Sequence, residues 1–313
     1  MTRTADAPEL PGSVPMVSAT SATNLSIVKP KRTVAGRLVS FLGHSVVNVV
    51  LALIAIFWLV PTVGLFVASL RNSTDNSQSG WWTIFTAPAQ LTLENYGNLL
   101  GNSQFMSSFI NTIIITLPAT LLVIVIGALA GYAFAWIDFP GRDWLLIAVI
   151  VMLAVPVQVA LIPIARLFGT LGLFGSVVGV VIFHVSFGLP FAIFLLRNFF
   201  TQIPSELMEA AKLDGASEWR IFTRVIVPLG MPAIASLGIF QFLWVWNDLL
   251  VALIFTNASS QPVTVAIQSQ LRQFGANIDV LSSGAFLSMI IPLIVFFAFQ
   301  RYFVTALLAG SQR

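Results

Sequence analysis

The chain has 313 residues, of which 57% are hydrophobic and only 9% are charged, with a formal net charge of +3. Soluble domains carry roughly 25% charged residues, so this composition excludes an ordinary soluble fold and indicates an integral membrane protein. The sequence has no cysteine, which excludes disulfides and thiolate metal sites, and its two histidines are too few for a histidine-rich metal site. The basic residues form no patch that would favour binding to nucleic acid.

Residues 1–43 are predicted to form a flexible N-terminal tail that ends in a basic flank. The segment is rich in Pro, Ser, Thr and Ala, and such a segment cannot bury enough apolar surface to become ordered. The first apolar run begins only near Ser45, which is too late for a cleavable signal peptide. We therefore expect this run to be an uncleaved membrane helix.

Six apolar runs follow the tail, and each reaches the length of about 20 residues that a spanning helix needs. They cover roughly 45–69, 107–136, 144–165, 176–197, 232–255 and 284–308. Backbone groups in lipid must be satisfied within the segment, so the runs predict six membrane helices in an all-α transmembrane domain over 44–313. Prolines inside or near the runs predict kinks, at Pro61, Pro118, Pro156, Pro163, Pro190 and Pro292.

The distribution of Lys and Arg predicts the topology, because cytoplasmic loops of membrane proteins are enriched in both. With the N-terminus inside, twelve of the fifteen basic residues lie on the inner side and three, Arg71, Arg166 and Arg272, on the outer side. Both termini and the polar stretch 204–232 are therefore expected in the cytoplasm. In the first long outer loop, Trp81 and Trp82 favour anchoring at the membrane interface, with contact to an external partner as the alternative.

The stretch 204–232 concentrates charge between two apolar runs. Seven charged residues fall within nineteen positions, namely Glu206, Glu209, Lys212, Asp214, Glu218, Arg220 and Arg224. An amphipathic helix lying on lipid headgroups is the alternative interpretation. The acidic residues argue against it, because the anionic inner leaflet attracts Lys and Arg rather than Asp and Glu. The stretch therefore predicts a docking element for a cytoplasmic partner.

Local signals divide this stretch into two short helices. Ser205 is expected to cap the first, which Asp214-Gly215 ends. Ser217 is expected to cap the second, which runs from Glu218 to about Val225 and is ended by Pro228 and Pro232 before the fifth membrane helix.

Asp248 is the one charge well inside a predicted helix, and ionisable groups in that position usually face a cavity or a partner. With Trp244 and Asn247 it would offer hydrogen-bonding groups and an apolar ring to a sugar, so these three residues are candidates for a substrate pathway. The alternatives are a buried structural hydrogen bond that holds kinked helices together, or a position at the outer interface. For His184, a satisfied core position is favoured over a pathway role, and the GxxxG spacings at 127–131 and 175–179 favour helix packing.

Glu209-Ala210-Ala211, followed by Gly215 and Pro228, resembles the EAA signature in the permease subunits of bacterial ABC importers. Asp214 and Ala216 fit the longer form that is typical of carbohydrate permeases, whereas Val225 and Val227 depart from the Ile and Leu of the family pattern. Nearly all of the chain from about residue 45 is similar to the six-helix subunit of maltose-type and α-glucoside permeases, although the tail is longer than usual. The sugar-permease pattern is carried by LTLENYGNLL, Asn111-Thr112, Pro156 to Pro163, Trp246-Asn247-Asp248 and RYFVTALLAGSQR. The phrases FGLPFAIFLLRNFF, WVWNDLLVAL and QRYFVTALLAG most resemble α-glucoside transporters within that group.

The resemblance implies a type I ABC importer transmembrane domain with a cytoplasmic coupling helix, in a bacterial cell membrane. It implies that the chain alternates access together with a second permease subunit and receives a sugar, such as an α-glucoside or oligosaccharide, from an extracytoplasmic binding protein. Coupling to an ATPase dimer would use the signature residues Glu209, Ala210, Ala211, Asp214, Gly215 and Ala216.

The sequence contains no GxxxxGK[ST] phosphate loop, so the chain is expected to be non-catalytic, with ATP and Mg²⁺ bound by the partner ATPase. No cofactor or metal of its own is expected. An ABC permease for another small solute, such as an amino acid or phosphate, is the nearest alternative. A secondary transporter is disfavoured by the lack of an obvious internal repeat, and a non-transporting membrane scaffold would leave the EAA pattern unexplained.

Overall fold

The computed structural model describes the backbone of residues 34–274 and 278–311, and the side chains of 46–270 and 278–300. Most of the predicted N-terminal tail, the side chain of Arg272 and the side chains of the C-terminal RYFVTALLAGSQR phrase lie outside the described residues.

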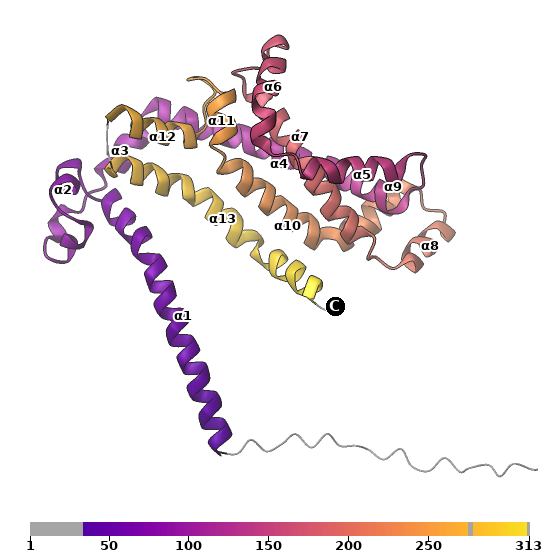
Figure 1. The fold of residues 1–313 in the computed structure, drawn as a ribbon, viewed down its shortest axis with the longest axis horizontal. Helices are drawn as coiled ribbons and strands as arrows, with labels where there is room; N and C mark the ends of the chain where they lie inside the picture. The colour runs from indigo at the N-terminus through magenta and orange to yellow at the C-terminus, as the bar shows by residue number, and fades with distance from the viewer. Residues whose placement is uncertain (1–33, 275–277, 312–313) are drawn as a thin grey trace, which may run out of the picture. The chain divides into compact units, whose positions relative to one another are not determined.

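All regular structure in the described residues is helical, as the sequence predicted (Figure 1). The α-helices are α1 (Val34–Ser69), α2 (Ser73–Gln78), α3 (Glu94–Gly101), α4 (Ser103–Trp136), α5 (Arg142–Leu153), α6 (Val157–Thr170), α7 (Val177–Phe200), α8 (Ser205–Leu213), α9 (Glu218–Ile221), α10 (Val227–Trp246), α11 (Leu250–Phe255), α12 (Val263–Phe274) and α13 (Ile278–Ser311). Two short 3₁₀ helices, η1 (Trp81–Phe85) and η2 (Pro88–Gln90), follow α2, and a π-helix, η3 (Phe222–Ile226), joins α9 to α10.

By packing, the chain divides into two units, Met1–Trp58 and Leu59–Arg313. In the described part of the first unit, every side chain from 46 to 58 is exposed and most are apolar. A helix that is apolar all round is suited to lipid or to another membrane helix. The second unit contains the remaining elements.

The described residues contain five helices that are long and apolar enough to cross a membrane, and a sixth span if the bent pair α5–α6 counts as one. The prediction of one helix over 144–165 is therefore wrong, since α5 and α6 meet at an angle of 103°. Pro156 precedes α6 with extended backbone angles, φ −64° and ψ 131°. Proline cannot donate a helical hydrogen bond and disfavours helix in the residue before it, which explains the break. The kink predicted at Pro156 is confirmed.

The centre of the second unit is the contact between α4 and α7. A Cβ added to Gly127 would lie 2.7 Å from the Cβ of Ala192, and one added to Gly131 would lie 3.1 Å from the Cβ of Leu196. Only glycine permits this backbone approach, so the predicted packing role of the 127–131 spacing is confirmed. Val123, Ala128 and Leu196 then share one buried cluster with residues of α8, α9 and α10.

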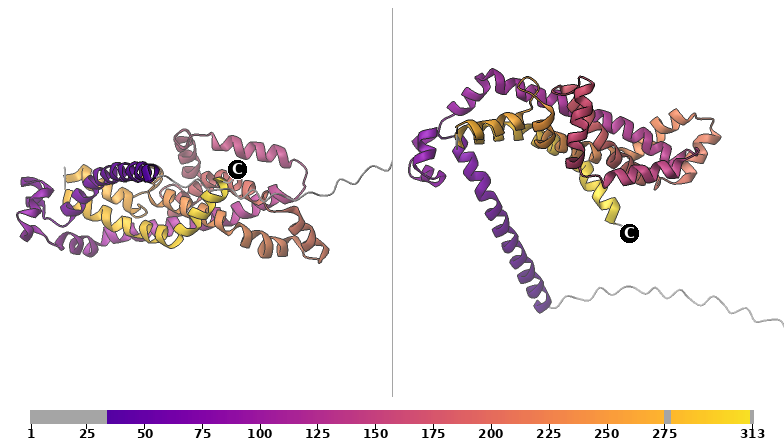
Figure 2. Two further views of the ribbon diagram at one scale, coloured as in Figure 1. Left: turned by 90° about the horizontal axis from the view of Figure 1, so that it is seen from below. Right: turned by 45° about the horizontal axis from the view of Figure 1, so that its top comes forward.

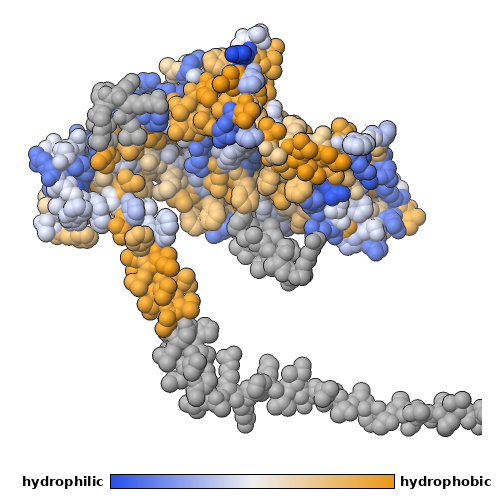
Figure 3. Space-filling view, in the orientation of Figure 1, coloured by the Kyte–Doolittle hydropathy of each residue, from blue (hydrophilic) through white to orange (hydrophobic). Residues whose placement is uncertain are grey.

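The two ends of α4 contact different parts of the second unit. Figures 1 and 2 show α8 and α9 near its C-terminal end and α3 and α12 near its N-terminal end. On the face drawn in Figure 3, hydrophilic side chains gather near α2 and near α8, whereas apolar ones dominate over α5 and α6 between them. At 1.5 Å per residue, the 34 residues of α4 extend over about 50 Å, enough to cross a bilayer from one polar zone to the other.

The segment between α1 and α4 folds around Arg71, which is 1% exposed. Its guanidinium donates hydrogen bonds to Gln90 Oε1 at 3.1 Å and to the carbonyl oxygen of Asp75 at 2.8 Å. Asn95 in α3 donates to the carbonyl oxygens of Ser69 at 2.9 Å and Arg71 at 2.8 Å. These bonds fix α3 to the end of α1.

The tryptophans of this segment differ in their surroundings. The Nε1 atom of Trp81 lies 2.8 Å from the position that a Cβ of Gly64 would occupy, whereas Trp82 is 62% exposed. Trp81 therefore packs on α1, and anchoring at the membrane interface stays a prediction for Trp82.

We predict that Gly127→Leu will lower the melting temperature of the purified protein in detergent, because the new side chain must push α4 away from Ala192. Overpacking of this kind costs about 1–3 kcal/mol. Gly97→Leu in α3 is the matched control, since a Cβ there meets nothing within 4 Å. Equal melting temperatures for the two variants would contradict the assigned contact.

Candidate functional site

The candidate coupling element begins with α8, whose ends are built from local signals. Glu206 lies in the first turn and Lys212 in the last, and both charges complement the helix dipole. The prediction that Ser205 caps this helix is wrong by one position, because Pro204 has an extended ψ of 134° and Ser205 is already helical.

Gly215 ends α8 in a Schellman motif. Its φ of +74° lies in the left-handed region, which glycine adopts without steric cost. The Gly215 N–H donates to the carbonyl oxygen of Lys212 at 3.0 Å, and the Ala216 N–H donates to that of Ala211 at 3.0 Å. This bond pattern satisfies the last carbonyls of the helix. The glycine of the signature is thus required by the turn.

One side of α8 is anchored in the protein and the other is open. Met208 is 3% exposed and belongs to the cluster that includes Leu196 of α7 and Ile221 of α9. Of the six signature residues, Ala211 and Ala216 pack against that cluster, whereas the other four are exposed, namely Glu209, Ala210, Asp214 and Gly215. Leu213, beside them, is 89% exposed. The open side thus combines an apolar side chain, small residues and carboxylates.

Glu218 holds the coupling element against the transmembrane helices, a role that the sequence did not indicate. Its Oε1 lies 3.4 Å from Nζ of Lys212 in α8, and its Oε2 accepts a hydrogen bond from the Tyr132 hydroxyl in α4. Opposite charges six residues apart were a visible signal for the first contact. Tyr132 could not be identified, because it lies 86 residues away in the sequence.

The end predicted for the second short helix is wrong. α9, η3 and α10 form one helical run over Glu218–Trp246, in which Pro228 lies in the first turn of α10. Pro228 has no N–H to donate to a helical hydrogen bond. The π-helical turn η3 before it changes which carbonyl oxygens need a donor, so the missing N–H does not end the helical run. The stretch from Glu218 is consequently continuous with a transmembrane helix.

The candidate pathway residues lie where α10 ends, and the prediction of one helix over 232–255 is wrong. Asp248 occupies the break before α11, where its Oδ1 accepts from the Val251 N–H at 3.3 Å and its Oδ2 from the Ala252 N–H at 3.0 Å. Free N–H groups at a helix start favour a carboxylate, which explains why the apolar run breaks there. Asp248 is therefore a cap between helices.

The neighbours of Asp248 have distinct environments. His184 is 1% exposed, with Nε2 3.7 Å from Oδ2 of Asp248, and the described residues offer its Nδ1 no hydrogen-bond partner. The expected burial of His184 in the core is confirmed, whereas its hydrogen bonds are not all satisfied among the described residues. Trp244 is 39% exposed, and its ring lies at a right angle to the ring of His184. Asn247 is exposed, and its amide donates to the carbonyl oxygen of Leu243 at 2.8 Å.

Asn111 and Thr112 hold the segment that leads into α12. The Asn111 amide donates to the carbonyl oxygen of Ser259 at 2.9 Å, and the hydroxyl of Thr112 accepts from the Val263 N–H at 2.8 Å. These bonds connect positions about 150 residues apart, which explains a polar pair within an apolar helix.

A family model described as "binding-protein-dependent transport system inner membrane component" matches residues 123–308, more than half of the chain. The chain is 48% identical over 270 residues to the osmoprotective compounds uptake permease protein GgtD of Synechocystis sp., covering 85% of this chain and 91% of that protein. It is 45% identical to the alpha-glucoside transport system permease protein AglG of Rhizobium meliloti, covering 78% of this chain and 66% of that protein.

The fold is similar to that of a chain in a bacterial ABC transporter involved in the import of the acidic polysaccharide alginate. The TM-score is 0.75 at 23% identity, and the match covers 88% of this chain and 99% of that chain. Together with the bent spans and the exposed EAA helix, these matches decide the class. The chain belongs to the family of binding-protein-dependent transport system inner membrane components, the permeases of ABC importers.

Proposed function

We propose that the chain forms, with a second permease subunit, the alternating-access pathway of a sugar importer that is driven by a partner ATPase dimer. The observation that carries the proposal is that one side of α8 is exposed while the buried Met208 anchors the helix. After α8 the chain reaches Glu218, where the helical run that contains a transmembrane helix begins. A surface that is open to a partner and firmly joined to a membrane helix is what mechanical coupling requires.

The sugar class is supported by the relatives. AglG is named for alpha-glucosides, and the alginate transporter imports a polysaccharide. Both are hydroxyl-rich solutes, and we propose the same class for this chain, delivered by an extracytoplasmic binding protein. ATP and Mg²⁺ would be bound by the ATPase, since this sequence has no phosphate-binding loop.

Coupling is proposed to act through the open side of α8. Glu209 would pair with basic residues of an ATPase cleft, Leu213 would fill an apolar hollow, and Ala210 would allow close approach of the two backbones. Closure of the ATPase dimer on ATP would then move α8 together with α9, η3 and α10. This arrangement places α8 and both termini in the cytoplasm, in agreement with the twelve-to-three distribution of basic residues.

For the substrate pathway we propose Trp244 and Asn247, whose side chains are partly or fully exposed at the end of α10. Asp248 would act on the pathway indirectly, since its oxygens already accept hydrogen bonds from α11. Its place in the mechanism would be to fix the break between α10 and α11.

We predict that Glu209→Lys will abolish co-purification of ATPase activity with the tagged protein from mild detergent, because it reverses the charge presented to the partner. Glu94→Lys is the control, as an equally exposed carboxylate in the first turn of α3. Membrane insertion should be unchanged in both. Retention of the ATPase by Glu209→Lys would contradict the assignment of α8 as the docking helix.

We predict that Gly215→Pro will abolish ATP-dependent uptake in reconstituted liposomes, whereas Gly215→Asn will retain a large part of it. Proline is fixed near φ −65° and cannot adopt the observed +74°, whereas asparagine tolerates the left-handed region. Wild-type uptake by Gly215→Pro would show that the Schellman turn is not needed for coupling.

A further inference from the structure

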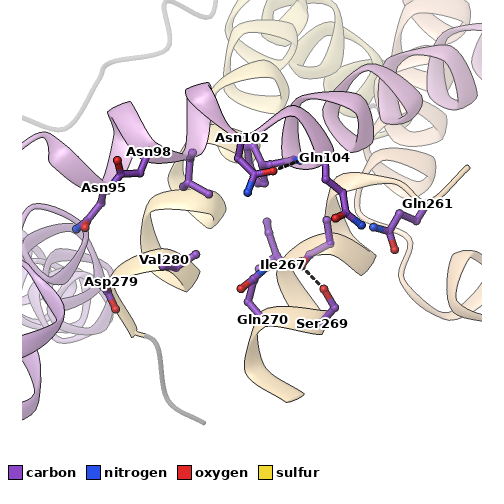
Figure 4. Close-up of a pocket in the computed structure, with 13 residues that line it drawn as sticks. Asn95, Asn98, Asn102, Gln104, Gln261, Ile267, Ser269, Gln270, Asp279 and Val280 are labelled. Atoms are coloured by element: carbon purple, nitrogen blue, oxygen red, sulfur yellow. Dashed lines mark hydrogen bonds between the residues drawn. The ribbon is translucent and has the colours of Figure 1, made fainter. Parts of the chain in front are cut away.

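A polar cavity of about 290 Å³ lies at the end of the second unit opposite α8 (Figure 4). It is bounded by α3, the first turn of α4, α12 and the first turn of α13. Pockets that bind drug-sized molecules have volumes of about 300–1,000 Å³, so this cavity lies at the lower end of that range and matches a small solute or one unit of a longer one.

Four amide side chains line the cavity without a recorded hydrogen-bond partner in the described part of the chain, namely Asn98, Gln104, Gln261 and Gln270. Figure 4 shows Gln104 and Gln261 directed toward one another across it. Two other amides nearby are already used by the fold, since Asn95 binds carbonyls of α1's end and Asn102 caps α4 through the Phe105 N–H at 3.0 Å. The four free amides are therefore available to a ligand.

Asp279 adds a carboxylate to this set. It is 8% exposed and lines the cavity, and its Oδ1 is buried with no hydrogen-bond partner among the described residues. A buried carboxylate without donors is costly, so a ligand that brings hydroxyl groups would relieve that cost. Among the side chains that the structure describes, no lysine or arginine lines the cavity, and the negative charge of Asp279 disfavours anions there.

The remaining wall is apolar. Leu99, Phe105 and Ile267 belong to a buried cluster beneath the cavity, and Phe105 presents a ring that is 8% exposed. Sugars combine C–H faces with hydroxyl groups that both donate and accept hydrogen bonds. Amides also donate and accept, whereas a carboxylate accepts only. Amides, one carboxylate and an aromatic ring together match this chemistry.

We propose that this cavity binds one unit of a neutral, hydroxyl-rich solute at the outer end of the permease. The hydroxyl groups would donate to Asp279 and exchange hydrogen bonds with Asn98, Gln104, Gln261 and Gln270. The inference rests on the proposed function for the outer location and for the choice of a sugar as the solute. It adds a subsite whose lining residues do not include Trp244 or Asn247.

The test uses the absence of cysteine from the chain. Ser269 lines the cavity and its hydroxyl donates to the Ala266 carbonyl oxygen, so Ser269→Cys is a near-isosteric reporter. Ser77→Cys, on the exposed part of α2, is the matched reporter outside the cavity. The rate of alkylation by a maleimide is measured on the full chain in lipid nanodiscs, with trehalose, glycine betaine, glucuronate or Ca²⁺ at equal concentration.

Trehalose is expected to slow alkylation at 269 by at least threefold and to leave position 77 unaffected. Betaine, which lacks hydroxyls, and glucuronate, which is an anion, should protect far less. Asp279→Ala should raise the trehalose concentration needed for half protection at least tenfold. If Asp279→Ala aggregates, or if position 77 is alkylated at an abnormal rate in it, Gln270→Leu is used instead. It should likewise raise the trehalose concentration needed for half protection.

Two results would overturn the proposal. Protection by Ca²⁺ and not by trehalose would make the cavity a cation site, and equal protection at 269 and 77 would make the effect non-specific. The assay needs no ATPase, so its failure is distinct from failure of the proposed function. If trehalose does not protect position 269 in a chain that still supports ATP-driven sugar uptake, the subsite alone is rejected. If trehalose protects position 269 in a chain that binds no ATPase, the coupling alone is rejected.

Discussion

The contact of α4 with α7 at Gly127 is the interaction on which the rest of the second unit depends. Because only the methyl group of Ala192 lies between the two backbones there, α4 is held firmly in the bundle along its centre. Its C-terminal turn then receives the Glu218 carboxylate through Tyr132, and its N-terminal turn contributes Gln104 and Phe105 to the cavity beside α12. One helix thus connects the proposed coupling surface with the proposed solute subsite.

Two contacts of different kinds hold the coupling element, the Lys212–Glu218 ion pair and the buried side chain of Met208. The Lys212–Glu218 ion pair is half exposed, and exposed pairs contribute only about 0–1 kcal/mol, so it adds little to stability. Burial of Met208 removes a large apolar side chain from water and provides most of the attachment. The polar contacts of Glu218 instead set the orientation of α8 with respect to α4. A residue that sets orientation affects coupling more than it affects folding.

Hydropathy and charge predicted most of the architecture, because long apolar runs in lipid have few alternatives to helix. The runs over 107–136 and 176–197 correspond closely to α4 and α7. Prediction was wrong where capping or helix geometry overrides the hydropathy pattern. The pair Asn247-Asp248 lies within a long apolar run, so only the capping bonds to α11 reveal the break. The continuity through Pro228 depends likewise on a π-helical turn that no local rule indicates.

The site was predictable to different degrees at its two ends. Residues 209–216 are consecutive, so a motif could identify them, and Gly215 meets a backbone requirement that the break signal anticipated. The cavity residues are scattered between Asn98 and Asp279, and ordinary surface loops contain the same amides. Only the fold brings them together, and only burial distinguishes Asp279 from an exposed carboxylate.

In the proposed mechanism α8 moves with α9, η3 and α10 when the ATPase closes, and the contact of Glu218 with Tyr132 makes α4 part of the same moving body. The direct measurement is the distance between spin labels at Leu207→Cys and Ile126→Cys, both exposed positions in a chain without native cysteine, in the assembled transporter with and without ATP. We expect a narrow distribution of label distances that ATP leaves unchanged in the otherwise native chain. In Glu218→Ala we expect a broad distribution of these distances. A distribution that shifts with ATP in the otherwise native chain would contradict the proposed mechanism, because α8 would then move independently of the bundle.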